Sequence, residues 1–227
     1  MRLLNRVPAA VFCLAAALAL VTLGGCRIEK RSAVGTSASA ADTGSFANAN
    51  FDPKALVAKI WTSKVLPDLQ SRAGELGALR TAMAGNLDAA GAAHGYREPG
   101  SNAPWSMATK FRGKIVSVET ESSAGQIGVD VDGDGKADVV VQIGPVVRGT
   151  AIRDSLSFIS FNNYANQIEF AELADAFNKK AYASVLEDLP RDALKGREVE
   201  VLGVFTTADG QQMSAVTPVE LKLGATP

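Results

Sequence analysis

The spacing of apolar residues changes twice along the chain, and each change marks a different kind of element. Between residues 51 and 87 apolar side chains recur every three or four residues, which predicts helices. From residue 107 onward the period shortens to two, which predicts strands. One long helical stripe then separates two groups of strands. The predicted order is therefore two helices followed by β-β-β-α-β-β.

The first predicted helix has a full set of start signals. Asp52 can cap it, and Pro53 suits its first position because an N–H there would have no helical partner. Phe51 and Leu56 occupy the two positions of a hydrophobic staple. Pro67 lies inside the same apolar pattern. It should bend or split the helix, because proline cannot donate the next backbone hydrogen bond.

The second helical pattern is shorter and ends among small residues. Its apolar positions are Leu76, Leu79, Met83 and Leu87. The pattern breaks down over residues 91–95, and the Gly, Pro, Asn and Ser content of residues 96–104 predicts a loop. We therefore expect a helical section at residues 51–104.

The remainder of the chain predicts a small barrel. Strands are expected at residues 111–120, 125–131, 138–143, 198–206 and 214–223, with one helix at 168–186. Asn166, with Glu169 three residues later, imitates a capping box at the start of that helix. This order is the connectivity of an OB-fold, in which a helix joins the third and fourth of five strands. The predicted fold class is α+β, with an OB-like five-stranded barrel at residues 105–227. A generic α+β sandwich is the alternative.

The N-terminus has the pattern of a secretory signal. Arg2 and Arg6 precede an uncharged run at residues 11–23, which is too short to span a bilayer. The run ends in Leu23-Gly-Gly-Cys26, which resembles a bacterial lipobox. The resemblance implies that residues 1–25 are a lipoprotein signal peptide and that lipidated Cys26 anchors the protein to a membrane. An ordinary signal peptide followed by an incidental cysteine is the alternative.

Composition limits the classes of partner. The chain carries 23 Lys and Arg against 24 Asp and Glu, and losing residues 1–25 takes its net charge from -1 to about -3. Nucleic acid is not expected as a partner, because phosphate backbones need a basic surface. Cys13 precedes the lipidation site, so the mature chain has no cysteine pair for a disulfide. Residues 26–50 are rich in Ser, Ala and Thr and predict a flexible tether.

An aspartate cluster between two predicted strands is the strongest chemical signal. It matches the oxygen-ligand spacing of a calcium loop through Asp130, Asp132, Asp134 and Asp138. Gly135 stands at the sixth position, but Val141 replaces the bidentate Glu at the twelfth. These four aspartates are candidate ligands for Ca²⁺. The alternative is a hairpin tip in which Asp and Gly supply turn geometry.

Catalytic groups are scarce in this sequence. His94 is the only histidine, and no thiol remains beside Cys26 in the mature chain, so a triad or a histidine-based zinc site is not expected. Paired carboxylates need no histidine, but Glu119 and Glu121 occupy ordinary surface positions of one strand. We predict that the protein is not an enzyme.

The connection at residues 144–168 is longer than most loops, and long loops often carry binding function. Its candidate ligand-binding residues are Arg148, Arg153, Asp154, Asn162, Asn163 and Gln167. Amides, Asp and Arg together are suited to polyol recognition. The alternative is that these side chains satisfy the connection's own backbone groups and plug one end of the barrel.

The lipobox is accompanied by further distinctive segments: Phe51-Asp-Pro, Ile60-Trp-Thr-Ser-Lys-Val65, the aspartates of 130–138, Gly144-Pro-Val-Val-Arg-Gly-Thr150, Ile159-Ser-Phe-Asn162 and Asn166-Gln-Ile168. Together they resemble a family of predicted periplasmic lipoproteins of unknown function. Members of that family are often encoded beside sugar ABC-transporter components. The resemblance therefore implies a transporter component or a small solute as partner, but it transfers no functional residue.

These observations converge on a periplasmic, lipid-anchored protein that acts as a non-enzymatic binding or accessory module. Arg27, and not Asp, follows Cys26, which favours the outer membrane in a Gram-negative host. The alternative is a structural or scaffolding protein of the envelope, with a calcium-stiffened hairpin.

Overall fold

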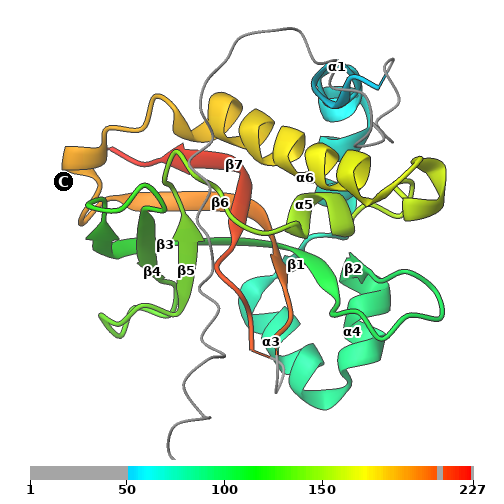
Figure 1. The fold of residues 1–227 in the computed structure, drawn as a ribbon. Coiled ribbons are helices and arrows are strands. Elements are labelled where there is room, and N and C mark those ends of the chain that lie inside the picture. Colours follow the sequence, from blue (N-terminus) through cyan, green and yellow to red (C-terminus); the bar gives the residue numbers. More distant parts are fainter. Residues whose placement is uncertain (1–50, 209–211, 226–227) are drawn as a thin grey trace, which may run out of the picture. The chain divides into compact units, whose positions relative to one another are not determined.

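The computed structural model describes residues 51–208 and 212–225, and Figure 1 shows its fold. The predictions for the signal peptide, for Cys26 and for the tether lie outside these residues. The described part is a mixed α+β structure in which helices precede a curled, mainly antiparallel sheet. This agrees with the predicted fold class.

Five strands form the barrel. They are β3 (Ser106–Glu119), β4 (Gln126–Asp130), β5 (Val139–Gln142), β6 (Glu198–Thr206) and β7 (Thr217–Leu223). They are hydrogen-bonded in the order β5-β4-β3-β6-β7. A parallel bridge between Val141 and Val216 links the two outer strands, and α6 (Gln167–Ala181) lies between β5 and β6 in the chain. This is the OB connectivity that the sequence predicted.

Strand β3 is the longest and starts five residues earlier than predicted. Its first part pairs with two short strands, β1 (Gly74–Glu75) and β2 (Gly95–Tyr96), and its second part pairs with β4. Residues 106–109 are all buried, so they lack the alternation that marks a strand with one exposed face. The start of β3 could therefore not be predicted from an alternating pattern, because both faces of the sheet are covered there.

The N-terminal helices follow the predicted signals. Helix α1 (Pro53–Ile60) is capped by Asp52, whose Oδ1 accepts a hydrogen bond of 2.9 Å from the N–H of Ala55. A π-helical turn, η1 (Trp61–Val65), then leads into α2 (Leu66–Arg72). Pro67 splits the helix as expected. The wider turn directly before it accommodates a residue that has no N–H to donate.

The second helical section ends at His94, within the range 91–95 predicted for its end, but it has an earlier break that the sequence pattern did not predict. Helix α3 (Leu76–Gly85) ends at Asn86, whose side chain accepts a hydrogen bond of 2.9 Å from Ala89 and starts a new helix, α4 (Leu87–His94). Gly91 lies inside α4, and a Cβ placed there would come within 2.2 Å of the Trp105 ring. The glycine is thus needed for close packing and does not end the helix.

The connection between β5 and α6 contains a short helix, α5 (Ala151–Asp154), and a 3-10 turn, η2 (Phe161–Asn163). Asn166 caps α6 by accepting hydrogen bonds from the N–H groups of Ile168 and Glu169. A π-helical turn, η3 (Tyr182–Leu186), and a 3-10 turn, η4 (Arg191–Ala193), complete the path to β6.

Two apolar clusters stabilise the two sides of the sheet. One fills the barrel and is closed by α3 and α4, with Met107, Phe111 and Phe205 among its buried members. The other packs α1, α5 and α6 against β3, β6 and β7, with Trp61 and Phe177 at its centre. Figure 1 shows α1 and α6 on one side of the strands, and α3 and α4 on the other.

Candidate functional site

The aspartate cluster forms a compact turn between β4 and β5, here called the Asp turn (residues 130–138). Asp130 is buried, and its two carboxylate oxygens accept hydrogen bonds from the N–H groups of Gly133 and Gly135, at 2.7 and 2.8 Å. Both glycines have a positive φ, of 87° and 84°, which L side chains rarely adopt. The positions of Asp and Gly in this turn therefore follow from its backbone geometry.

Three of the four aspartates converge. Carboxylate oxygens of Asp130, Asp132 and Asp138 lie within 4.8 Å of one another. Asp134 lies outside this group, with its Oδ2 3.3 Å from Nζ of Lys136. Val141, at the position of the missing bidentate Glu, is fully buried in the barrel. The donor set for a divalent cation thus amounts to three carboxylates, and the calcium assignment stays a prediction.

Arg80 of α3, which is distant from the Asp turn in the sequence, contacts this turn. Its guanidinium donates a hydrogen bond to the backbone oxygen of Asp138 and lies 3.7 Å from that residue's Oδ1. Asp138 Oδ2 accepts hydrogen bonds from the N–H groups of Val131 and Asp132, at 2.7 and 3.2 Å. Asp138 therefore joins the Asp turn to α3.

A surface hollow of about 660 Å³ opens beside this contact. We call it the β5 hollow, and it is lined by α3, the start of β4, the first half of β5 and residues 212–215. Arg80, Gln126 and Asp138 supply polar groups, while Met83 and Met213 supply apolar surface. The hollow thus combines hydrogen-bonding groups with an apolar wall, which is the usual make-up of a small-molecule site.

Sequence reasoning did not identify the β5 hollow. Arg80 falls between the apolar positions of a helix and reads as an ordinary solvent-facing residue. Residues 212–215 read only as the approach to the last strand. No local pattern connects the two segments, because only the closed barrel brings them together.

The structure places Arg153 in contacts with Asp154 and with Phe170 of α6. Arg153 is buried, donates a hydrogen bond of 2.8 Å to the backbone oxygen of Phe170, and lies 3.7 Å from the centre of that residue's ring. Its Nε lies 2.7 Å from Oδ1 of Asp154. These contacts join α5 to α6, and they use groups that the sequence suggested for a ligand.

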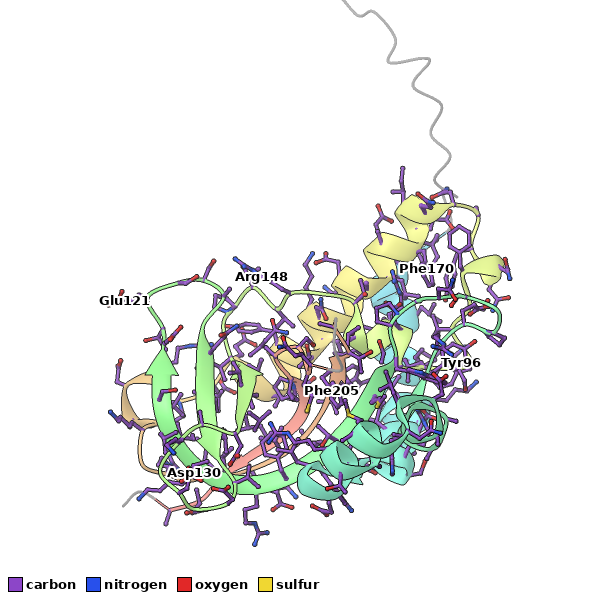
Figure 2. The ribbon with its side chains drawn as sticks, turned by 90° about the horizontal axis from the view of Figure 1, so that it is seen from below. Tyr96, Glu121, Asp130, Arg148, Phe170 and Phe205 are labelled. Carbon is purple, nitrogen blue, oxygen red and sulfur yellow. The ribbon has the colours of Figure 1, made fainter. Side chains whose placement is uncertain are left out.

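The other four candidates of the connection are exposed and do not converge. Asn162, Asn163 and Gln167 lie on η2 and at the start of α6. Arg148 lies well away from Phe170 in Figure 2, and its backbone is hydrogen-bonded to the side chain of Gln142. None of these residues lines the β5 hollow. Their role in ligand binding stays a prediction.

The titratable groups near the connection form no catalytic pair among the described residues. His94 Nδ1 lies 2.7 Å from the backbone oxygen of Arg72, to which it donates a hydrogen bond. Burial raises the pKa of Tyr164, against the opposing effect of Arg153. Burial, with hydrogen bonding to Glu98, also raises the pKa of Tyr96. Both tyrosines therefore stay protonated at neutral pH, and no catalytic function is indicated.

No helix in the described residues has both the length and the apolar character needed to cross a bilayer.

Comparison with solved structures supports the fold. An OB-fold protein from Thermotoga maritima matches with a TM-score of 0.59 and 18% identity, over 77% of this chain and 99% of that one. No curated protein sequence matches this chain. The profile of DUF2291, described as predicted periplasmic lipoprotein, matches residues 16–222 of this chain. The chain belongs to this family of predicted periplasmic lipoproteins.

Proposed function

We propose that this lipoprotein is a non-enzymatic binding module and that the β5 hollow is its ligand site. One observation carries the proposal: the hollow is lined by β4, β5 and residues 212–215, the described part of the β6–β7 connection. In the OB-fold, the second and third strands and the loop between the fourth and fifth are the surfaces that bind ligands. Strands β4 and β5 and residues 212–215 hold these places in this chain.

The chemistry of the hollow fits a short glycan or another polyol. OB-folds bind oligosaccharides and oligonucleotides on this face. The mature chain's mild negative charge disfavours an oligonucleotide, because phosphate contacts need a basic surface. Gln126 and Gln212 offer amides, Arg80 and Asp138 offer charged partners, and Met213 offers an apolar contact to a sugar face.

The biological setting is an extension of the same proposal. A glycan-binding lipoprotein held at a membrane would deliver its ligand to a sugar ABC transporter, consistent with the gene neighbourhoods that the family resemblance implies. The Arg that follows Cys26 favours the outer membrane in a Gram-negative host. The test of the ligand site requires neither a transporter nor a membrane.

The test is a thermal shift of the mature protein against a panel of monosaccharides and short oligosaccharides. A ligand that binds only the folded state raises the melting temperature. Val140, 40% exposed on β5, faces the hollow, so Val140→Lys should abolish the shift by blocking it. Val146→Lys is the matched control, because Val146 is 48% exposed and lies outside the hollow.

Two results would contradict this assignment. One is the absence of any shift with the native protein across the panel. The other is a shift that survives Val140→Lys but disappears with Asn162→Ala or Gln167→Ala, which would place the site in the 144–168 connection.

The second candidate function is scaffolding, with the Asp turn stiffened by Ca²⁺. The specific observation in its favour is the convergence of the Asp130, Asp132 and Asp138 carboxylates. With three carboxylates and no bidentate Glu, the affinity would fall in the weak range of extracellular calcium modules. Crosslinking in intact envelopes, with and without a chelator, would reveal protein partners that depend on the cation.

A further inference from the structure

A second surface, at the other end of the domain from the Asp turn, has an unusual composition. The stretch Ser155–Ile168 contains no charged residue, although 21% of the chain is charged. Of the five exposed large hydrophobic residues in the described ranges, three lie in this stretch: Phe158, Phe161 and Ile168, at 38%, 41% and 58%. We call it the apolar end. A concentration of exposed apolar side chains in one uncharged stretch points to an interaction surface.

The apolar end is held in place from below. The Phe161 ring packs edge-on against Phe170, with centroids 5.4 Å apart, and Tyr164 lies 5.5 Å from the same ring. The Arg153 guanidinium contacts both the backbone oxygen and the ring of Phe170 and so holds Phe170 in place. Ser160 donates a hydrogen bond of 3.2 Å to Glu98. The exposed Phe161 ring is therefore presented on a fixed frame.

The N-terminal segment enters the domain at this same end. Phe51, the first described residue, packs edge-on against Tyr164 with ring centroids 5.6 Å apart. Residues 27–50 connect it to Cys26, the lipidation site that the lipobox predicts, and even at full extension they reach only about 80 Å. The end of the domain that is joined to the membrane anchor is thus the end with uncharged, partly aromatic surface.

We propose that the apolar end rests on the phospholipid surface to which Cys26 is anchored. Phe158, Phe161 and Ile168 would enter the interfacial layer, where aromatic and apolar side chains are favoured. The uncharged amides of Asn162 and Gln167 would meet the headgroups. Figure 2 shows Phe170 and Asp130 at opposite ends of the domain, so the Asp turn would face away from the bilayer. This inference rests on the lipid anchor and is independent of what the β5 hollow binds.

The mature chain allows a clean test, because no cysteine follows Cys26, and lipidation of Cys26 would leave no free thiol. Ile168→Cys and Phe158→Cys are each labelled with an environment-sensitive fluorophore in the acylated protein. Val140→Cys is the matched control, equally apolar and 40% exposed, on the β5 face. Each protein is reconstituted in vesicles of phosphatidylethanolamine and phosphatidylglycerol, and thermal melts confirm that the labelled variants are folded.

Quenchers attached to lipids should dim the labels at 158 and 168 about two-fold more than the label at 140, since only the former reach the interface. A water-borne quencher should give the reverse order. Equal lipid quenching at all three positions would overturn the proposal, because the domain would then have no preferred face. Protection of 158 and 168 from both quenchers would also overturn it, because protein would then cover the apolar end. Either result leaves the glycan test at the β5 hollow unaffected.

Discussion

The Asp turn at residues 130–138 and the apolar end at residues 155–168 are both irregular surface segments, but their backbone and side chains find partners in different ways. In the Asp turn, carboxylate oxygens accept hydrogen bonds from backbone N–H groups two to seven residues away along the chain. In the apolar end, the supporting contacts come from distant elements, such as Phe51 and Glu98. The Asp turn is held mainly by local hydrogen bonds, with Arg80 of α3 as its distant partner, whereas the apolar end depends on several distant elements.

This difference bears on function. A turn that satisfies its own carboxylates needs no ligand to explain its sequence, so its acidic residues alone are weak evidence for a cation. The exposed surface of Phe158, Phe161 and Ile168 has no such internal explanation, because 38%, 41% and 58% of these residues stay uncovered by the described part of the chain. The contrast can be tested by changes that remove one support at a time.

The largest effect is expected where the Asp turn joins the barrel. A Cβ at Gly113 of β3 would lie 2.2 Å from the backbone oxygen of Asp130, so Gly113→Ala must push β3 and β4 apart. We expect a loss of about 3 kcal/mol in the free energy of unfolding, measured by urea denaturation. Gly77→Ala, in α3 with no atom within 4 Å of the new Cβ, is the control and should be neutral or slightly stabilising. Equal stability of the two variants would contradict this close approach of the strands.

The next effect concerns the frame of the apolar end. Arg153→Ala removes a buried cation from the Phe170 ring and leaves the Asp154 carboxylate without its guanidinium partner. We expect a loss of about 2 kcal/mol in the free energy of unfolding. Arg148→Ala, at an exposed position of the same connection, should stay within about 0.5 kcal/mol of the native protein. Loss of ligand binding in Arg153→Ala would therefore not by itself identify Arg153 as a ligand contact, whereas similar stability of both variants would refute its structural role.

These two cases also show which features the sequence could predict. The Asp52 cap, the split at Pro67 and the OB order of elements depend on neighbours within a few residues or on a regular period, and the structure bears them out. The packing role of Gly91 in α4 was missed because its partner is Trp105, a distant residue that leaves no room for a side chain. Likewise the start of β3 has no alternation, because the sheet is covered on both faces there.

The candidate site was predicted less well for the same reason. The sequence could identify the Asp turn, whose residues are adjacent, but it could not show that Arg80 of α3 lies against Asp138. The sequence could single out Arg153 by residue type. The hydrogen-bond partner of Arg153, however, is the backbone oxygen of Phe170, seventeen residues away. Hydrogen-bonding capacity is visible in a sequence, whereas the partner that uses it is set by the tertiary fold.

A smaller effect should distinguish members of the Asp turn. Both carboxylate oxygens of Asp130 accept hydrogen bonds from backbone N–H groups. Asp130→Asn replaces one of these oxygens by an amide nitrogen, which cannot accept a hydrogen bond. We expect a loss of about 1 kcal/mol in the free energy of unfolding by urea denaturation. Asp134→Asn keeps the single acceptor used by the N–H of Lys136 and lies exposed, so it should change stability by less than about 0.5 kcal/mol. The reverse order would mean that the local hydrogen bonds do not hold the turn.

The smallest expected effect is the change in melting temperature on adding calcium. It distinguishes a cation site from a hairpin tip whose carboxylates bind only the turn's own N–H groups. At a calcium concentration equal to a millimolar Kd, binding adds about 0.4 kcal/mol, which raises the melting temperature by about 1–2 °C. Asp132→Asn removes one converging carboxylate and should abolish this shift, whereas Asp134→Asn lies outside the converging group and should retain it. Magnesium at the same concentration should have less effect, because it demands a near-ideal octahedron that three carboxylates of one turn do not supply. A melting temperature that calcium leaves unchanged, measured by calorimetry after chelation and replenishment, would show that the turn's own N–H groups and Arg80 fully account for its aspartates.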